Sequence, residues 1–160
     1  DRFIQIAQKV YEKTKLPIIV CGTDVDKEIN KKFINLVNNG VEVIDLTNKT
    51  TILEYIGLIK KAKFIITNDT GIYHIATVSQ VTTALLTGGY TFDKYSHYEF
   101  KGNDNYKKPY IIYEEMECFN CNNRCIYRNK IKQTWPCLEK ISVNKAWKVI
   151  EKMIDNESKK

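Results

Sequence analysis

The sequence is short of the features that mark fibrous, disordered or membrane-spanning chains. Its 160 residues include only seven glycines and three prolines, which excludes a collagen-like repeat. Hydrophobic residues make up 43% of the chain, which is too many for an intrinsically disordered protein. The longest apolar runs, such as residues 17–21, have the length of a strand and fall far short of the ~20 residues of a membrane span. These absences predict one soluble globular domain over residues 1–160, long enough to bury its own core.

Apolar runs alternate with helical patterns along the chain. Strands are predicted at residues 17–21, 41–46, 64–67, 81–87 and 110–113. Helices are predicted between the first four, and a last helix at 142–155 is capped by Ser142. Residues 90–109 lack periodicity and predict a loop. Strands that alternate with helices of about ten residues imply βαβ units, so the fold class is α/β, with a Rossmann-like parallel sheet and flanking helices.

The helix predicted between the strands at 17–21 and 41–46 carries two expectations, one about capping and one about burial. Asp24 or Asp26 is expected to cap it, and Thr50 or Thr51 is expected to cap the next helix. Its inward face is expected to consist of four apolar side chains, namely Ile29, Phe33, Leu36 and Val37. The strand at 17–21 is expected to be buried.

Three loops follow predicted strands at the edge where open parallel sheets bind ligands. They are residues 22–26, 68–71 and 88–90. In the second loop, Gly71 allows a close approach to the backbone, and the free N–H groups of the following helix suit a phosphate. Thr70 adds a hydroxyl donor, Asp69 suits sugar hydroxyls, and His74 on the first helical turn can donate to either.

The same residues can also be read as purely structural. Asp69 can simply cap the helix, Gly71 can ease the turn, and His74 can be an ordinary surface or core histidine. The triplet Asp69-Thr70-Gly71 also occurs in aspartic proteases, where it lies in a hairpin-like loop and is used twice. Here the next residues are helical and the sequence has no second copy, which argues against a protease.

The string Asp69-Thr-Gly-x-x-His-Ile-Ala, between a strand and a helix, resembles glycosyltransferase family 9, whose best-known members are the ADP-heptose:lipopolysaccharide heptosyltransferases. The resemblance extends over residues 46–54, 62–76, 88–89 and 137–142. It implies a GT-B architecture of two Rossmann-like domains, with this chain as the C-terminal half that binds the nucleotide-sugar donor. The N-terminal acceptor domain is then absent from the chain. The start at Asp1 rather than at methionine fits a part of a longer protein.

The resemblance assigns roles to particular positions. Thr70 and Gly71 would contact the diphosphate, with Asp69 and His74 at the donor sugar. The backbone near Thr50 would pass the adenine, and Asp24 or Asp26 would meet the ribose. The donor-binding residues expected on this basis are Asp24, Asp26, Thr50, Asp69, Thr70, Gly71, His74, Gly88 and Gly89.

The implied reaction is an inverting transfer of a sugar, with heptose from ADP-heptose as the expected donor group and a lipopolysaccharide or related glycan as acceptor. The general base would lie in the absent domain, so no catalytic residue is expected here and the chain alone would bind donor without turnover. No paired carboxylates for a metal-bound diphosphate stand out, so no cofactor is expected for catalysis. Residues 90–97 depart from the heptosyltransferase pattern and leave the sugar open. The implied location is cytoplasmic, with peripheral contact at the inner face of the membrane.

Four of the five cysteines cluster late in the chain, as Cys118-x2-Cys121-x3-Cys125-x11-Cys137. Four thiolates suit a structural zinc site, whereas reduced thiols or a disulfide formed on oxidation are the alternatives. Of the formal charge of +6, residues 101–160 hold most, with 13 basic and 8 acidic side chains.

The segment 118–137 itself holds basic and aromatic side chains and no acidic one. It therefore supports a second hypothesis, a non-catalytic, zinc-containing module that binds nucleic acid. The same composition also suits contact with anionic lipid headgroups, or an ordinary basic face exposed to solvent. The sequence as a whole favours the donor-binding domain, without nucleic acid as a partner.

Overall fold

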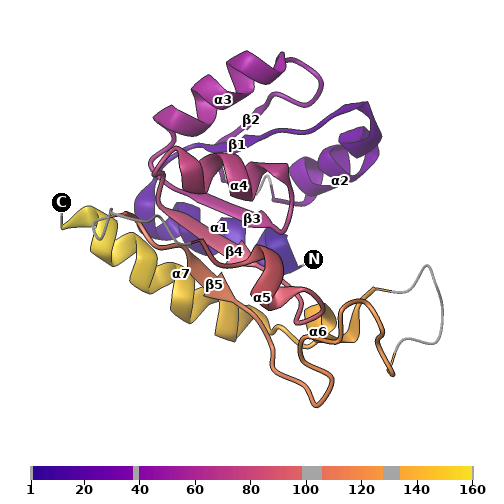
Figure 1. The fold of residues 1–160 in the computed structure, drawn as a ribbon. Helices are drawn as coiled ribbons and strands as arrows, with labels where there is room; N and C mark the ends of the chain where they lie inside the picture. Colours follow the sequence, from indigo (N-terminus) through magenta and orange to yellow (C-terminus); the bar gives the residue numbers. More distant parts are fainter. Residues whose placement is uncertain (1, 38–39, 99–105, 128–133, 160) are drawn as a thin grey trace. The chain divides into compact units, whose positions relative to one another are not determined.

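Helices and strands alternate along the described chain, as the sequence predicts (Figure 1). The computed structural model describes residues 2–37, 40–98, 106–127 and 134–159. The chain divides into two compact units, Asp1–Ile56 and Gly57–Lys160. Strand pairs are parallel in both units, which confirms the α/β class and the parallel pairing. No helix among the described residues is long and apolar enough to cross a membrane.

The first unit is built from two helices and a parallel strand pair. α1 (Arg2–Thr14) packs against α2 (Lys27–Val37), and β1 (Ile18–Val20) pairs with β2 (Val43–Asp45). A short 3₁₀ turn, η1 (Asp24–Asp26), leads into α2, and α3 (Ile52–Lys61) begins at the end of this unit. Ala7, Val37 and Val41 are buried at the centre, with Phe33 and Ile18 packed against them.

Two burial expectations for the first unit are wrong. Within α2 only Val37 is buried; Ile29 is 68% exposed and Leu36 is 47% exposed. The reason is that α2 meets the core at its C-terminal end, through Phe33 and Val37, which lie one turn apart on the same stripe. The strand at 17–21 is not fully buried either, because Ile19 is 45% exposed.

The second unit contains a three-stranded parallel sheet in the order β3-β4-β5. The strands are β3 (Ile65–Asn68), β4 (Thr83–Leu86) and β5 (Tyr110–Ile112). α4 (Gly71–Val78) packs against β3 and β4, and α7 (Val143–Ser158) packs against β4 and β5. The predicted cap of the last helix is confirmed, since the Ser142 hydroxyl accepts a 3.1 Å hydrogen bond from the Lys145 N–H.

Two short helices were not predicted. α5 (Phe92–Tyr95) lies in the segment that the sequence assigns to a loop, and α6 (Pro136–Glu139) lies at the last cysteine. Each has four residues, a single turn, which is too short for an apolar period to be recognised. Part of the predicted loop, residues 99–105, lies outside the described residues.

Candidate functional site

The loops that follow β3 and β4 meet at one edge of the three-stranded sheet. Because the two strands are parallel neighbours, with Asn68 opposite Leu86 at their ends, their carboxyl ends point the same way. The Asp69 carboxylate, in the first of these loops, also acts on Tyr90, in the second. The pKa of the Tyr90 phenol is raised mainly by burial and next by the negative charge of Asp69. The structure therefore brings together two of the three loops that the sequence singles out. The third, residues 22–26, belongs to the first unit.

The turn from β3 into α4 leaves room beside its backbone. Thr70 is the N-cap residue of α4, with an extended backbone, and its side chain makes no capping hydrogen bond. Gly71 then begins the helix, and apart from its chain neighbours and the backbone of its own helix, no heavy atom lies within 4 Å of where its Cβ would be. Gly71 is not in the left-handed region, so neither its conformation nor its packing requires glycine. The first N–H groups of α4, those of Gly71 and Ile72, have no carbonyl partner within the helix.

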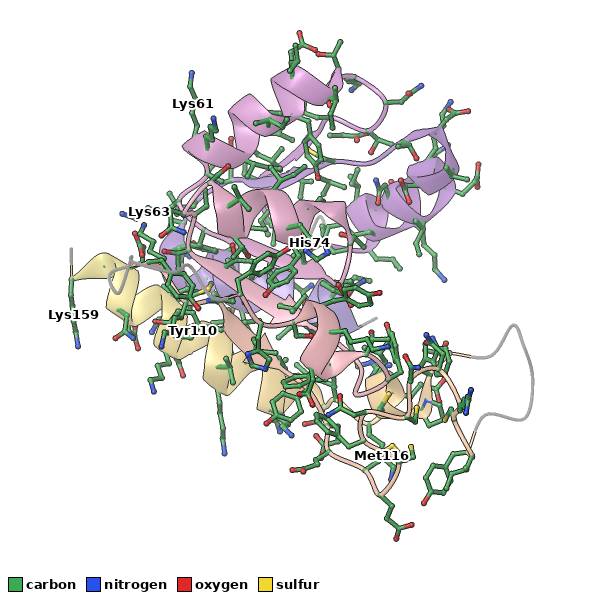
Figure 2. The ribbon with its side chains drawn as sticks, in the orientation of Figure 1. Lys61, Lys63, His74, Tyr110, Met116 and Lys159 are labelled. Atoms are coloured by element: carbon green, nitrogen blue, oxygen red, sulfur yellow. The ribbon has the colours of Figure 1, made fainter. Side chains whose placement is uncertain are left out.

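Asp69 and His74 lie close to each other at this turn. The Asp69 side chain is 14% exposed, and its Oδ1 lies 3.8 Å from His74 Nε2, too far for a direct hydrogen bond. His74 is 38% exposed and projects from α4, where Figure 2 labels it. Since Thr70 is the N-cap residue, the simpler interpretation that Asp69 merely caps the helix does not hold.

A third side chain that sequence reasoning missed, Tyr98, completes this group. Its hydroxyl forms a hydrogen bond with Nδ1 of His74. Burial, and then the nearby Asp69 carboxylate, raise the pKa of Tyr98. The sequence gives only one indication of this role, which is that residues 90–98 are rich in aromatic side chains. Nothing in the spacing links position 98 to position 74.

Gly88 and Gly89 are surrounded by side chains rather than by open space. A Cβ on Gly88 would lie 2.3 Å from a ring carbon of Tyr90 and 3.0 Å from Cys137 Sγ. A Cβ on Gly89 would lie 2.5 Å from a ring carbon of Phe119. These contacts give both glycines a packing role; a role at the donor stays a prediction.

Among the predicted site residues of the first unit, Asp26 takes part in a capping motif and Thr50 lies next to another. The Asp26 carboxylate accepts hydrogen bonds from the N–H and the hydroxyl of Thr23, at 2.8 and 2.9 Å, and these bonds lower its pKa. The N-cap residue of η1, the turn that leads into α2, is therefore Thr23, with Asp26 as its partner in a capping box. That Asp24 or Asp26 caps α2 itself stays a prediction. Thr51, the residue after Thr50, pairs in the same way with Glu54.

The four clustered cysteines share one cavity. Cys118, Cys121, Cys125 and Cys137 line it together with an aromatic wall of Tyr90, Phe119 and Trp135. All four thiols are free. Burial raises the pKa of the Cys118 thiol, and the neighbouring Cys125 and Cys121 raise it further. Among the described residues, no three cysteine, histidine or acidic side chains are gathered as they would be around a bound metal ion.

The cysteine segment is attached to the loop after β4. The Asn120 N–H donates to the Gly89 carbonyl at 2.7 Å, and its side-chain amide donates to Asp93 Oδ2 at 2.5 Å. Lys94 Nζ donates to Asn122 Oδ1 at 2.7 Å, and the Tyr90 ring stacks on Trp135 with centroids 4.7 Å apart. The segment therefore supports one of the two loops of the candidate site. Figure 2 shows sulfur atoms gathered near the labelled Met116.

The chain is similar to several known proteins. The family model described as glycosyltransferase family 9 (heptosyltransferase) matches residues 1–86. Lipooligosaccharide heptosyltransferase 2 of Campylobacter jejuni subsp. jejuni serotype O:6 is 27% identical over 119 residues, which are 74% of this chain and 36% of that protein.

Solved structures share the fold. The E. coli ADP-heptose LPS heptosyltransferase II superposes with a TM-score of 0.70 at 17% identity, over 98% of this chain and 41% of that one. A dodecameric iron-containing heptosyltransferase, TibC, in complex with ADP-D-beta-D-heptose, gives a TM-score of 0.55 at 15% identity, over 90% and 47% of the two chains. This chain spans about a third to a half of the length of these proteins. Because the family model covers more than half of its residues, the chain belongs to glycosyltransferase family 9.

Proposed function

We propose that this chain is the donor-binding, C-terminal half of a GT-B glycosyltransferase that transfers heptose from ADP-heptose to a lipopolysaccharide or related surface glycan. Family membership and the heptosyltransferase relatives support the proposal. The observation on which the proposal depends is the loop Asp69-Thr70-Gly71, which leads into α4 and has open space beside Gly71.

The diphosphate binds at the start of α4. Its oxygens accept hydrogen bonds from the N–H groups of Gly71 and Ile72, where the helix dipole favours negative charge. The Thr70 hydroxyl, which makes no capping bond, adds a donor. Asp69 and His74 bind the hydroxyl groups of the sugar: the Asp69 carboxylate accepts hydrogen bonds from them, and the imidazole N–H of His74 donates one to them. The ribose contact of Asp24 or Asp26 and the adenine contact near Thr50 stay predictions for the first unit.

The chemistry of this half is the stabilisation of the departing diphosphate. Helix dipole and backbone N–H groups spread the charge that develops on it, without a catalytic metal. The general base that deprotonates the acceptor hydroxyl, and the acceptor site itself, lie in residues beyond this chain. The 160-residue chain therefore binds donor and does not turn it over. A place at the inner face of the cytoplasmic membrane, with the basic segment against anionic lipid, completes the proposal; residues 128–133 of that segment lie outside the described residues.

Titration with nucleotides tests the proposal. Calorimetry of the chain with ADP, UDP and GDP should show saturable binding that is strongest for ADP. ADP-heptose should bind more tightly than ADP, because the sugar adds contacts. Absence of any nucleotide binding, together with salt-sensitive binding of RNA or DNA, would instead establish the nucleic-acid module as the function.

Replacing Asp69 by asparagine distinguishes binding of the sugar from binding of the diphosphate. The Asp69→Asn variant should lose about tenfold in affinity for ADP-heptose, the equivalent of one hydrogen bond to a charged group. Its affinity for ADP should stay level or rise, since a negative charge next to the phosphates is removed. Equal losses for both ligands would contradict the assignment of Asp69 to the sugar.

We also propose that the four clustered cysteines hold a structural metal ion, zinc being the expected one. The support is that four thiols, which are ligands that zinc prefers, line a single cavity, although among the described residues no three of them are gathered as they would be around a bound metal ion. The metal would act through structure alone, by holding the cysteine segment against the loop after β4. The TibC heptosyltransferase is described as iron-containing, which makes iron the second metal to measure.

Metal analysis of protein purified without chelator decides this point. About one zinc, or one iron, per chain is expected, and its removal by a chelator should lower Tm, because a bound structural metal contributes to folding. The Cys118→Ser variant should lose the metal, whereas Cys21→Ser, outside the cluster, should keep it. A wild-type chain that contains neither metal would overturn the proposal.

A further inference from the structure

The segment 96–98, which follows α5, is fixed by two tyrosine hydroxyl groups. The Tyr73 hydroxyl donates a 2.5 Å hydrogen bond to the Ser96 carbonyl, and the Tyr106 hydroxyl donates to the Tyr98 carbonyl. Ser96 is fully buried. Burial raises the pKa of Tyr73 to about 12, so its phenol stays protonated as a donor. The position of Tyr98 is therefore set by the fold rather than by a free loop.

From this segment, the Tyr98 side chain reaches the imidazole of His74. The phenol hydroxyl meets Nδ1, and the two rings stand edge to face with centroids 5.8 Å apart and an angle of 68°. The Tyr73 ring contacts the same imidazole edge to face, with centroids 5.2 Å apart. His74 is thus held from two sides, and its other nitrogen, Nε2, faces Asp69 at 3.8 Å.

The direction of the Tyr98 hydrogen bond determines whether Nε2 of His74 donates a hydrogen bond to a ligand or accepts one from it. Burial and the Asp69 carboxylate raise the pKa of Tyr98, so its phenol stays protonated and can donate to Nδ1. A neutral imidazole that accepts at Nδ1 carries its proton on Nε2. That N–H is on the side of the ring next to Asp69, whose Oδ1 lies 3.8 Å from Nε2, and the proposed donor would bind on this side.

We propose that Tyr98 is a positioning residue of the donor site, which fixes the ring orientation and the tautomer of His74 so that Nε2–H donates to the bound nucleotide sugar. This inference rests on the proposed donor-binding function. It adds a residue from the aperiodic segment after β4 to the two predicted loops that the structure brings together. Tyr98 acts through His74, and no contact of its own with the donor is needed.

Nitrogen-15 NMR of the imidazole rings tests the contact in the free protein. The chain has only two histidines, so a His97→Gln background leaves His74 as the single imidazole signal. In that background the wild-type spectrum should show His74 protonated at Nε2, with Nδ1 shifted by an accepted hydrogen bond. Tyr98→Phe should move the Nδ1 resonance and let the Nδ1–H form appear. Tyr95→Phe, a change at a 53% exposed tyrosine of α5, is the matched control and should leave the spectrum unchanged.

A double-mutant cycle on ADP-heptose affinity tests the action through His74. Tyr98→Phe should weaken binding about fivefold, as expected for one hydrogen bond, and His74→Gln should weaken it by at least as much. In the His74→Gln background, Tyr98→Phe should change almost nothing, because the partner through which it acts is gone.

The outcomes separate this inference from the function on which it rests. If the wild-type chain binds no ADP-heptose, the proposed function fails and the inference fails with it. If the wild-type chain binds and Tyr98→Phe binds equally well, with an unchanged Nδ1 resonance, only the inference about Tyr98 is wrong. Additive losses in the double variant would also overturn it, since they would mean that Tyr98 contributes independently of His74.

Discussion

The Gly71→Val variant should bind ADP about a hundredfold more weakly than the wild-type chain and keep its thermal stability. Phosphate oxygens must come within hydrogen-bond distance of the first N–H groups of α4, and the isopropyl group of valine would fill the space through which they approach. Losing two charge-assisted hydrogen bonds to backbone N–H groups corresponds to about 3 kcal/mol, which is roughly a hundredfold in Kd.

The fold should tolerate this change for reasons visible at the site. Apart from chain neighbours and the backbone of α4, no heavy atom lies within 4 Å of the Cβ position of Gly71, and the residue is not in the left-handed region. A Cβ at this position therefore meets no clash, and the backbone is not strained by it. Its helix propensity is better than that of glycine, so Tm should not fall.

Gly57 provides the matched control. It lies within α3, and the position of its Cβ is open in the same way as that of Gly71. Gly57→Val should therefore leave both ADP affinity and Tm close to the wild-type values. If Gly71→Val binds ADP as tightly as Gly57→Val does, the diphosphate does not bind at the start of α4, and the loop 68–71 leaves the proposed site.

The geometry around Gly71 follows from features that the sequence displays. A short apolar strand, a polar turn and an apolar helix occur in succession over residues 64–78, and local propensity and turn chemistry agree at each step. The helix start after Thr70 and the parallel pairing of β3 with β4 were therefore predictable. The cap at Ser142 was predictable for the same reason, since capping depends on residues that are close in the sequence.

Contacts between distant residues were not predictable in this way. Tyr98 lies 24 positions from His74 in a segment without periodicity, so no local pattern indicates their hydrogen bond. The exposure of Ile29 was missed because the apolar pattern of a helix shows which face is hydrophobic, and not how far a neighbouring helix extends along it. Tertiary packing decides both cases.

The three glycines of the candidate site show most clearly that the sequence does not reveal tertiary packing. The sequence presents Gly71, Gly88 and Gly89 as three similar residues after parallel strands, all suited to a bound ligand. The structure separates them, since open space lies beside Gly71, whereas aromatic rings occupy the space beside the other two. A glycine needed for a ligand and one required by a packed ring have the same letter in the sequence, and substitution by alanine distinguishes them.

The Gly88→Ala variant should lower the free energy of unfolding by about 2 kcal/mol, the usual cost of forcing an extra carbon into a packed interior. Its Cβ would lie 2.3 Å from a ring carbon of Tyr90, which cannot easily turn aside because it stacks on Trp135. For a domain of this size, such a loss lowers Tm by roughly 4–8 °C. Thermal unfolding measures it, with Gly57→Ala as the control, which should gain slightly in stability.

Combining Gly88→Ala with Tyr90→Ala identifies the source of the cost. If the ring is the obstacle, the alanine at position 88 should cost far less once the ring is removed, so the two changes should be non-additive by about 1 kcal/mol or more. ADP titration of the Gly88→Ala variant, at a temperature where it is fully folded, separates the remaining roles. Unchanged affinity assigns Gly88 to packing alone. A loss of affinity in the fully folded variant means that Gly88 also contributes to the donor site. At that temperature the lower stability no longer reduces the fraction of folded protein, so it cannot explain weaker binding.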